Sequence, residues 1–578
     1  MLFYAIVKQQ KEISFSLDPV VDDLLSEEII AMGPALPLSC WQDIFPANME
    51  NGQWLQAKDH FRKKISQRLK KTGIPQEFVQ LDLRKAFPPQ KWLAHQAILD
   101  HQALARSFAD KIRNRQLFEG QMKSLAADMG LTVSEIIVLA QQAVHLGLAE
   151  WVAAISRKGG QWRCTRCGET DLESWPGIYG ISRTCPHCLA LGALSSQQAV
   201  LRWTSMDTSG SGKKEMTGKK QTIPGAILPF QLTRAQEKAV QELRLIDKNM
   251  KTGQVKEALV WAACGAGKTE VVFEVIAQAL AEGERVLYAT PRRDVVHDTA
   301  QRSQQAFPEQ DTQILSGDLP RSFRQAGLVT ATTHQVYHYY QAFDLVILDE
   351  MDAFPYYGNK ALEYGIRQAM KPGARIINLT ATPSPEIRKK VQSGQVFLVR
   401  LPARHHRKPL PVPVLLKSKG LSMRTGSIEE QVRLELSRLR ANGPVLVFVP
   451  VIDLVPKIIN QLQVSFKGSK VGGSWSSDPD RQQKTQIFLK GEYDFFVSTS
   501  ILERGVTLNG LQVMVLFADH PVFDERSLVQ MAGRAGRTLE RPEGKVIFSG
   551  LTLTKAMKEA VEWIEEQNEI ARREGLVD

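Results

Sequence analysis

Cysteine is scarce in this sequence, and long hydrophobic runs are missing from it. Six cysteines in 578 residues do not suggest a framework of disulfides. No stretch approaches the ~20 consecutive apolar residues that a membrane-spanning helix needs. The apolar start, Met1 to Val7, is short, lacks a basic leader and runs into Lys8, so we expect a first strand there rather than a secretory signal. These absences predict a cytoplasmic protein with no transmembrane span, whose membrane contact is peripheral.

Positive charge is in excess, with a net charge of +11 and a pI of about 9.2. This excess favours a polyanionic partner, either nucleic acid or an acidic membrane surface. A basic but merely solvated surface explains the charge equally well, so charge alone does not distinguish between the two explanations. A chain of this length is too long for one hydrophobic core, and three or four domains are expected.

A phosphate-binding loop is predicted at residues 262–269 (AACGAGKT), which follow the apolar run 258–261. Gly265 and Gly267 let backbone N–H groups close on phosphates, and Lys268 reaches the β- and γ-phosphates. The hydroxyl of Thr269 is a ligand for Mg²⁺. Ala262 stands where glycine usually opens the loop, which is the variant found in helicase-type motors.

A second string, Asp349-Glu350, follows the apolar run 345–348 and supplies the other half of a hydrolytic site. Asp349 is expected to hold the magnesium ion, and Glu350 to orient and deprotonate a water molecule. The two strings in this order predict ATP hydrolysis with ATP and Mg²⁺ as cofactors. An inactive, degenerate fold is disfavoured because no catalytic position is substituted.

Four cysteines form two Cys-x₂-Cys pairs separated by 17 residues: Cys164, Cys167, Cys185 and Cys188. This spacing is typical of two knuckles that close one tetrahedral Zn²⁺ site, and four thiolates imply a structural metal. Redox chemistry and a pair of disulfides are the alternatives. His187 lies inside the second knuckle and is interpreted as a neighbour rather than a ligand. Basic residues interleave with Trp162, Trp175 and Tyr179 around this site, which suits single-stranded nucleic acid or, equally, a miniature core.

Residues 125–136 have helix-turn-helix spacing, with Gly130 at the turn and a possible capping box from Thr132 to Glu135. An ordinary helical hairpin fits as well as a DNA-reading motif, because the second helix lacks arginine and lysine.

The chain divides at changes of composition. We expect an α/β protein with two parallel-sheet lobes, preceded by a zinc-ribbon module and a mixed N-terminal region. The expected limits are 1–155 for an N-terminal accessory region, 156–203 for the zinc module, 204–224 for a linker, 225–402 for lobe 1 and 403–578 for lobe 2 with a C-terminal helix.

Further strings occur in a fixed order along the last two regions: 232–236 (LTRAQ), 289–292 (ATPR), 330–335 (TATTHQ), 380–383 (TATP), 498–506 (STSILERGV) and 530–537 (QMAGRAGR). Over roughly residues 225–550 this set resembles superfamily 2 helicases and translocases. The resemblance implies that the two lobes are RecA-like, with ATP bound between them and nucleic acid lying across both.

The resemblance also assigns residues. Arg534 and Arg537 match the positions whose guanidinium groups complete the γ-phosphate site, with Arg537 the preferred finger. Gln236 is matched to the adenine edge, and Gly505 to the nucleotide site. The matched nucleic-acid contacts are Thr290, Arg292, Thr332, Thr333 and Thr499, and the matched coupling motif contains Thr380 and Thr382.

Within that superfamily the chain is most similar to the ComFA family of late competence proteins, the DNA-uptake motors of transformable bacteria. The likeness rests on the four-cysteine module ahead of the motor, on residues 232–236, and on residues 349–355 (DEMDAFP), where the family form is close to DEVDAFP. Met351 is a mild departure. The primosomal replication-restart helicase is the nearest rival, but its cysteines lie within the motor.

The family implies a motor that moves single-stranded DNA at the inner face of the cell membrane. Its implied partners are a companion competence protein and the single-strand-loading protein. An ATP-regulated DNA-binding assembly factor, whose hydrolysis resets a complex without translocation, is the alternative of a different class.

Overall fold

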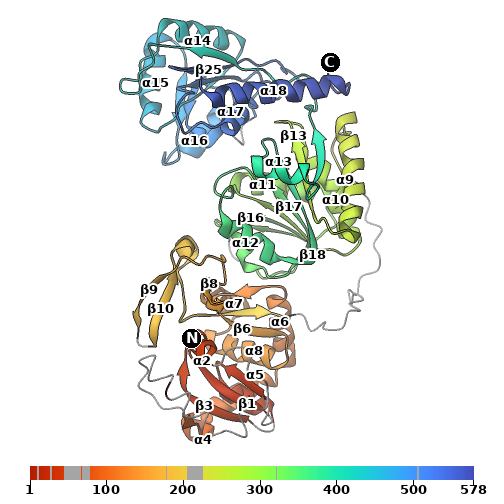
Figure 1. Cartoon of the computed structure of the whole chain (residues 1–578), viewed down its shortest axis with the longest axis vertical. Helices are drawn as coiled ribbons and strands as arrows, with labels where there is room; N and C mark the ends of the chain where they lie inside the picture. The colour runs from red at the N-terminus through yellow and green to blue at the C-terminus, as the bar shows by residue number, and fades with distance from the viewer. Residues whose placement is uncertain are drawn as a thin grey trace.

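The computed structural model describes residues 1–8, 12–26, 29–44, 67, 79–177, 179–204, 225–319, 322–503 and 507–577. The units stack along the long axis of the molecule, with the N-terminal region at the bottom of the view, one α/β lobe in the middle and a second at the top (Figure 1). The basic stretch 61–71 is, apart from residue 67, outside the described residues, as are 205–224 of the expected linker and Gly505.

The N-terminal region begins with the strand that its apolar start predicted, β1. An antiparallel sheet has the order β2-β1-β3-β4. Its strands are β1 (Phe3–Lys8), β2 (Glu12–Ser16), β3 (Ile29–Leu36) and β4 (Val79–Gln80). The helices are α1 (Pro19–Leu25), α2 (Leu38–Ile44), α4 (Leu83–Ala86), α5 (Pro89–Leu99), α6 (Gln102–Ile112), α7 (Glu119–Met129) and α8 (Val133–His145).

Helices α7 and α8 form the helix-turn-helix that the spacing indicated. Gly130 ends α7 at φ 66°, and Thr132 and Glu135 form the expected capping box. Helix α8 packs against α1, α5 and α7, and no residue from Glu135 to His145 is exposed. A recognition helix must offer a face to the major groove. The geometry therefore favours the ordinary helical hairpin over a DNA-reading role.

The four-cysteine segment is inserted between two paired strands, β6 (Ala149–Ala153) and β12 (Ala199–Trp203). These two strands form a sheet with β5 (Gln116–Leu117). The insertion itself contains a hairpin and a three-stranded sheet: β7 (Ile155–Lys158), β8 (Gln161–Cys164), β9 (Glu173–Gly177), β10 (Gly180–Cys185), the 3₁₀ helix η1 (Pro186–Leu191) and β11 (Leu194–Ser195).

Lobe 1 is a seven-stranded parallel sheet of order β15-β16-β14-β17-β18-β13-β19. Continuous apolar runs form its central strands because helices cover both faces of a parallel sheet. Its elements are α9 (Arg234–Thr252), β13 (Glu257–Ala262), α10 (Lys268–Ala281), β14 (Val286–Thr290), α11 (Arg293–Ala306), β15 (Thr312–Leu315), β16 (Leu328–Thr332), η2 (Gln335–His338), β17 (Phe343–Asp349), α12 (Lys360–Ala369), β18 (Met370–Thr380), α13 (Pro385–Gln392) and β19 (Phe397–Leu401).

Lobe 2 is a second parallel sheet, of order β20-β25-β24-β21-β23-β22. Its elements are β20 (Val414–Lys417), α14 (Glu430–Asn442), β21 (Val445–Phe448), α15 (Leu454–Ser465), β22 (Val471–Ser474), α16 (Arg481–Leu489), β23 (Phe495–Ser498), η3 (Ser500–Leu502), β24 (Gln512–Leu516), α17 (Glu525–Ala532), β25 (Val546–Gly550) and α18 (Lys555–Arg573). The fold class predicted from the sequence is confirmed.

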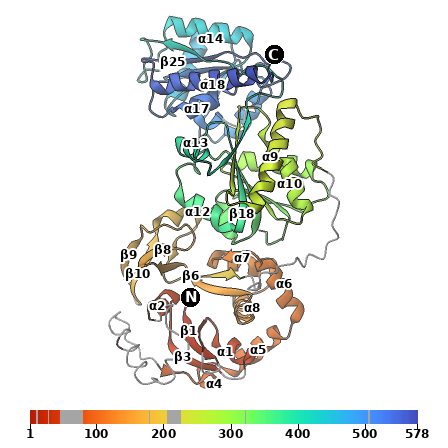
Figure 2. The same ribbon diagram turned by 45° about the vertical axis from the view of Figure 1, so that its right-hand side comes forward.

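Helix α18, the predicted C-terminal helix, connects the lobes. Trp563 packs on Trp261 of β13 with ring centroids 6.4 Å apart, and Lys238 of α9 pairs with Glu574 at 2.8 Å. The turned view shows α18 alongside lobe 2, with its C-terminal end facing the upper end of α9 (Figure 2). Both lobes are therefore held together by α18 through β13 and α9.

Among the described residues, no single helix has the length and apolarity to cross a membrane. The pair α7 and α8 reaches that length and composition only together, and it is bent by 105°.

Candidate functional site

The phosphate loop links the end of β13 to the start of α10. Gly265 and Gly267 have φ values of 82° and 80°, a region that residues with a Cβ rarely adopt. A Cβ at Gly267 would also collide with the side-chain amide of Gln236. The glycines therefore allow the chain to turn so that the first N–H groups of α10 face the cleft, where they can bind an anion.

Three donors fix the carboxylate of Asp349 at the end of β17. Lys268 Nζ lies 2.7 Å from Asp349 Oδ1, and the backbone N–H of Glu350 donates to the same oxygen at 2.8 Å. The hydroxyl of Tyr288, from the neighbouring strand β14, donates to Asp349 Oδ2 at 2.9 Å. The phosphate-loop lysine and the acidic motif thus meet, as the order of the two strings predicted.

Electrostatics keep these groups in the forms that the site needs. Burial disfavours the ammonium of Lys268, but the charges of Asp349 and Glu350 outweigh it and raise the pKa of Lys268. Burial, together with Asp349, raises the pKa of Tyr288 well above its ordinary value, so its hydroxyl stays a neutral donor. Lys268 therefore carries a full positive charge at neutral pH, ready for phosphate.

Glu350 has a φ of 54°, which is uncommon for a residue other than glycine. Strained backbone of this kind persists where the surrounding structure holds it, often at active sites. Two residues on, Asp352 accepts hydrogen bonds from the hydroxyls of Thr380 at 2.7 Å and Thr382 at 2.6 Å. The acidic motif is thereby joined to the end of β18, where the TATP string begins.

The nucleotide site lies between the lobes, in a cavity of about 420 Å³. Lobe 1 contributes the phosphate loop, Asp349 and Glu350, and lobe 2 contributes Gln530, Arg534 and Arg537. Arg534 is buried, and Arg537 donates to Thr507 Oγ1 at 3.3 Å. The two lobe 2 arginines that the resemblance matched to the γ-phosphate site thus line the same cavity as the phosphate loop.

Oxygen ligands for a magnesium ion are present in the same cavity. Thr269 lies in the first turn of α10 and Asp349 across from it, and both line the cavity. A hydroxyl and a carboxylate beside a phosphate site fit Mg²⁺, which binds few protein ligands and completes its shell with phosphates and water.

Gln236, which was matched to the adenine edge, makes hydrogen bonds beside the phosphate loop. Its side chain accepts from the N–H of Thr233 at 2.9 Å and donates to the carbonyl of Ala266 at 3.1 Å. The side chain is buried. The amide therefore links the start of α9 to the phosphate loop, and its contact with adenine stays a prediction.

The residues matched to nucleic-acid contacts gather at one edge of the lobes. Thr290 and Thr332 are register partners on β14 and β16, and the N–H of Thr333 donates to the carbonyl of Thr290 at 3.0 Å. These threonines, with Thr499 at the end of β23, are buried. Arg292 alone of the set lines an interlobe hollow; it pairs with Asp294 at 2.9 Å. The structure brings the set together but leaves the threonine side chains covered.

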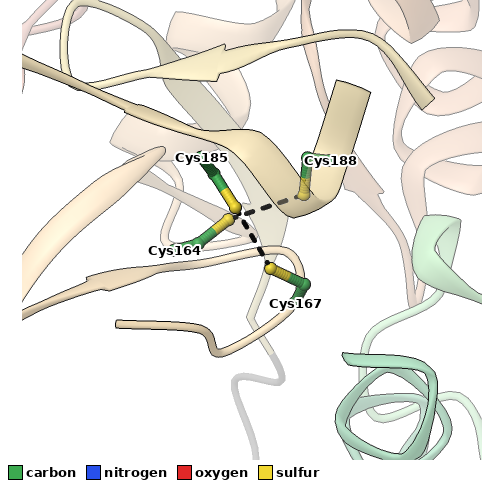
Figure 3. A group of neighbouring side chains, drawn as sticks. All are labelled: Cys164, Cys167, Cys185 and Cys188. Carbon is green, nitrogen blue, oxygen red and sulfur yellow. Dashed lines mark hydrogen bonds between the residues drawn. The ribbon is translucent and has the colours of Figure 1, made fainter. Parts of the chain in front are cut away.

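The four predicted cysteine ligands converge on one point (Figure 3). All four are buried, and their sulfur atoms lie within 4.8 Å of one another. Cys164 and Cys188 are 3.7 Å apart, and Cys167 and Cys185 are 3.4 Å apart. A tetrahedron of sulfurs with Zn–S bonds of about 2.3 Å has S–S edges of roughly 3.8 Å, whereas a disulfide needs about 2.0 Å. The set therefore fits a zinc ion and is not disulfide-bonded.

The three aromatic residues that the sequence analysis named around the cysteines differ in their exposure. Arg183 lies over the ring of Trp162 at 4.1 Å, and Tyr179 packs against the N-terminal core, while Trp175 is 40% exposed. His187 is exposed and outside the cluster. Two of the three aromatics thus serve packing, and only Trp175 is open to a ligand.

Some residues of the site carried no motif signal. Tyr288 occupies a strand position that sequence patterns treat as core. Arg404 lies in the proline-rich connector, and Phe354 lies in the DEMDAFP string but had no assigned role. A tyrosine or arginine with a polar partner across the fold is found only when the strands are assembled.

Two family models match this chain: the "Type III restriction enzyme, res subunit" model over residues 229–385 and the "Helicase conserved C-terminal domain" model over residues 428–538. The chain is 35% identical over 434 residues to the competence protein ComFA of Bacillus subtilis (strain 168), covering 74% of this chain and 89% of that protein. This chain belongs to the ComFA family. The ComFA of Streptococcus pneumoniae (strain ATCC BAA-255 / R6) is 34% identical, over 73% of this chain and 94% of its own length.

More distant relatives include the transcription-repair-coupling factor of Staphylococcus aureus (strain USA300), 24% identical over 55% of this chain and 27% of that protein. Among solved structures, RecG bound to a three-way DNA junction matches with a TM-score of 0.43 and 20% identity, over 61% of this chain and 49% of that one. The two helicase family models and the ComFA relatives identify the chain as a superfamily 2 ATPase, and ATP and Mg²⁺ are the cofactors that this class implies.

Proposed function

We propose that this ComFA-family chain is an ATP-driven motor that moves single-stranded DNA during the DNA uptake of natural transformation. The observation that carries the nucleic-acid part is an exposed aromatic side chain, Phe354, in a second interlobe hollow, attached to the motif that carries the catalytic carboxylates.

The chemistry proposed for the nucleotide cleft uses groups already in place. Lys268 would bind the phosphates in place of its present partner Asp349. Asp349 and Thr269 would hold a magnesium ion, which would neutralise phosphate charge. Glu350 accepts the proton of the attacking water. Arg537, with Arg534 beside it, stabilises the charge spread over the γ-phosphoryl oxygens.

The proposed DNA track is a hollow of about 1180 Å³ between the lobes, distinct from the nucleotide cavity. Arg292 and Arg293 line it from lobe 1, and Arg481 from lobe 2. Phe354 also lines it and is 88% exposed. Guanidinium groups suit phosphates, and an open aromatic face suits unpaired bases, each stacked base contributing about 1–3 kcal/mol.

A short path connects this track to hydrolysis. Phe354 lies two residues after Asp352, whose carboxylate is held by the hydroxyls of Thr380 and Thr382. Tyr357, three residues further on, receives the guanidinium of Arg526 from lobe 2 over its ring at 3.9 Å. A base that displaces Phe354 would therefore pull on the segment that holds Glu350 and on a contact between the lobes.

The four-cysteine site is proposed to hold one structural zinc ion, and Trp175 to add a stacking position outside the motor. The segment limits expected from the sequence, 1–155, 156–203, 204–224, 225–402 and 403–578, are retained as proposed units. Competence proteins at the inner face of the membrane are the proposed partners, a companion protein and a single-strand-loading protein.

The test is steady-state ATPase activity with single-stranded DNA of increasing length, duplex DNA and RNA, at several salt concentrations. A motor that travels should show stimulation that rises with strand length and then levels off, and that weakens as salt rises. Duplex DNA should stimulate less because its bases are stacked away from Phe354.

Two outcomes would overturn parts of the proposal. Equal stimulation by a short oligonucleotide and a long strand, both saturating, would favour an ATP-regulated assembly factor over a translocase. Stronger stimulation by duplex DNA or by RNA would refute the single-stranded DNA assignment.

A further inference from the structure

The connector between the lobes contains a buried arginine that the proposed mechanism does not use. Arg404 follows β19 in the segment that leads to β20, and only 1% of its surface is exposed. Buried arginines usually pair with a carboxylate. Every hydrogen bond recorded for the Arg404 guanidinium goes instead to a backbone carbonyl.

These carbonyls belong to the two lobes. Arg404 Nε donates to the carbonyl of Cys264 in the phosphate loop at 3.0 Å. Its two terminal nitrogens donate to lobe 2, to the carbonyls of Gly533 at 3.1 Å, Ala535 at 2.8 Å and Gly536 at 2.6 Å. Gly533 is the C-cap of α17, where a cation is also favoured by the helix dipole, and Ala535 and Gly536 lie in the turn that follows the helix.

Arg537 follows Gly536 directly in the chain, and its side chain lies against the phosphate loop. A Cβ at Gly265 would lie 3.2 Å from Arg537 Nε and 3.7 Å from Arg404 Nε. On the facing surface, a Cβ at Gly533 would lie 2.7 Å from Cys264 Sγ. Phosphate loop, connector and the end of α17 are therefore packed without room for a shift of one methyl group.

The position is electrostatically costly. Burial, and then the charge of Arg537, lower the pKa of Arg404 to about 9. Burial also lowers the pKa of Arg537. A guanidinium group that is buried beside a second one is retained only if other contacts hold it, and four carbonyls do so for Arg404.

We propose that Arg404 is a positioning residue for hydrolysis. Its hydrogen bonds hold the phosphate loop against the segment that follows α17, and so position Arg537 opposite the γ-phosphate. The planar fork of arginine reaches carbonyls on both sides at once, which the single ammonium of lysine cannot do. The inference rests on the proposed role of Arg537 but not on the nucleic-acid track, because basal hydrolysis requires the same geometry.

The experiment measures kcat, KM for ATP and Tm for the full-length variants Arg404→Lys, Arg537→Ala and the double variant. A misplaced catalytic group lowers turnover by about 10²-fold, so Arg404→Lys should reduce kcat to that extent while KM for ATP changes little. Because Arg404 acts through Arg537, the double variant should be no slower than Arg537→Ala.

Arg375→Lys is the matched control. Arg375 is 3% exposed and binds Asp247 at 2.6 Å and Glu284 at 2.7 Å, all within lobe 1. Both lysine variants should lower Tm, but only Arg404→Lys should lower kcat. The inference is overturned if Arg404→Lys keeps the parental kcat, if both lysine variants lose activity in proportion to Tm, or if the effects of Arg404→Lys and Arg537→Ala simply multiply.

Arg537→Ala distinguishes failure of the proposed arginine finger from failure of the positioning role of Arg404. If Arg537→Ala leaves kcat unchanged, the finger assignment in the proposed function fails and this inference fails with it. If Arg537→Ala abolishes turnover while Arg404→Lys does not affect it, the positioning role alone is refuted.

Discussion

The nucleotide cleft and the four-cysteine site differ in how the chain assembles them. The cysteine site draws all its side chains from residues 164–188, and its buried sulfurs leave a closed cluster. The cleft combines the phosphate loop with Arg537, some 270 positions later, and forms only where two lobes face each other. A closed local site is suited to holding a fold, whereas a site split between lobes can open and close. Substitutions should accordingly change stability at the first and rate at the second.

The largest expected effect is in the cleft. Arg537→Ala should leave nucleotide binding nearly intact and cut kcat by about 10³–10⁵-fold, the range for arginine fingers in related chemistry. The measurement is single-turnover hydrolysis together with equilibrium binding of a fluorescent ATP analogue. The exposed Arg541→Ala is the control for loss of one positive charge nearby. If Arg537→Ala hydrolysed ATP at the parental rate, another residue would have to serve as the arginine finger.

The next effect concerns the base. Glu350→Gln keeps the size of the side chain but removes its proton acceptor, so ATP should still bind while hydrolysis falls by about 10²–10⁴-fold. Lys268→Ala should instead weaken both binding and turnover, because it removes a phosphate contact. The exposed Glu309→Gln should behave as the parent. Hydrolysis at the parental rate in Glu350→Gln would show that another group takes the proton.

The same difference explains what could be predicted from the sequence. The cysteine cluster follows from spacing alone because its ligands are local. The alternation of apolar strands and helices was enough to predict two parallel lobes, and the paired strings were enough to bring Lys268 to Asp349. These features depend on residues close in sequence or at strand ends.

Contacts between distant segments escaped prediction. Tyr288 supports Asp349 from a neighbouring strand, and Arg404 reaches carbonyls of both lobes from the connector. The neighbouring sequence does not distinguish Tyr288 from an ordinary core tyrosine, or Arg404 from a surface arginine. For Gln236 the motif match predicted an adenine contact, which stays a prediction, whereas the hydrogen bond of its amide to the phosphate loop was not predicted.

At the cysteine site the expected change is one of folding rather than chemistry. Cys164→Ala should release one zinc ion per chain and lower Tm by several degrees, because metal binding and folding are coupled in such sites. Some basal ATPase should persist, since the phosphate loop lies elsewhere. Cys40→Ala, outside the cluster, is the control. Metal analysis that finds no zinc in protein purified in reducing buffer would contradict the assignment.

A smaller effect is expected at the proposed DNA track. Phe354→Ala should weaken binding of single-stranded DNA by about five- to 150-fold, the equivalent of one base stack of ~1–3 kcal/mol. Phe354→Trp should restore binding because it keeps an aromatic face. Fluorescence titration with a DNA strand containing 2-aminopurine measures both affinity and stacking. Equal affinity of the alanine variant, with Leu93→Ala as the control for an exposed apolar residue, would remove Phe354 from the track.

The smallest expected effect is a pH dependence at the connector beside Arg404. Burial, and then the charges of Arg404 and His405, lower the pKa of His406 to about 4. Its neutral ring donates from Nε2 to the carbonyl of Gly536 at 3.0 Å and accepts at Nδ1 from the N–H of Lys408 at 3.2 Å. Protonation would fill the accepting nitrogen and break the second bond.

The direction of the pH dependence of stability follows from the different pKa of His406 in the folded and unfolded chains. Between the ordinary histidine pKa of 6.5 and about 4, the unfolded chain takes up a proton at His406 and the folded chain does not. Stability therefore falls as pH falls through this window. His406→Gln removes that proton uptake, so its Tm should drop less than the parental Tm between pH 7 and pH 5, as calorimetry would measure. His520→Gln, away from the connector, should keep the parental slope. An unchanged slope in His406→Gln would show that the ring is not held neutral, and that the connector is packed more loosely against α17 than the hydrogen bonds of Arg404 require.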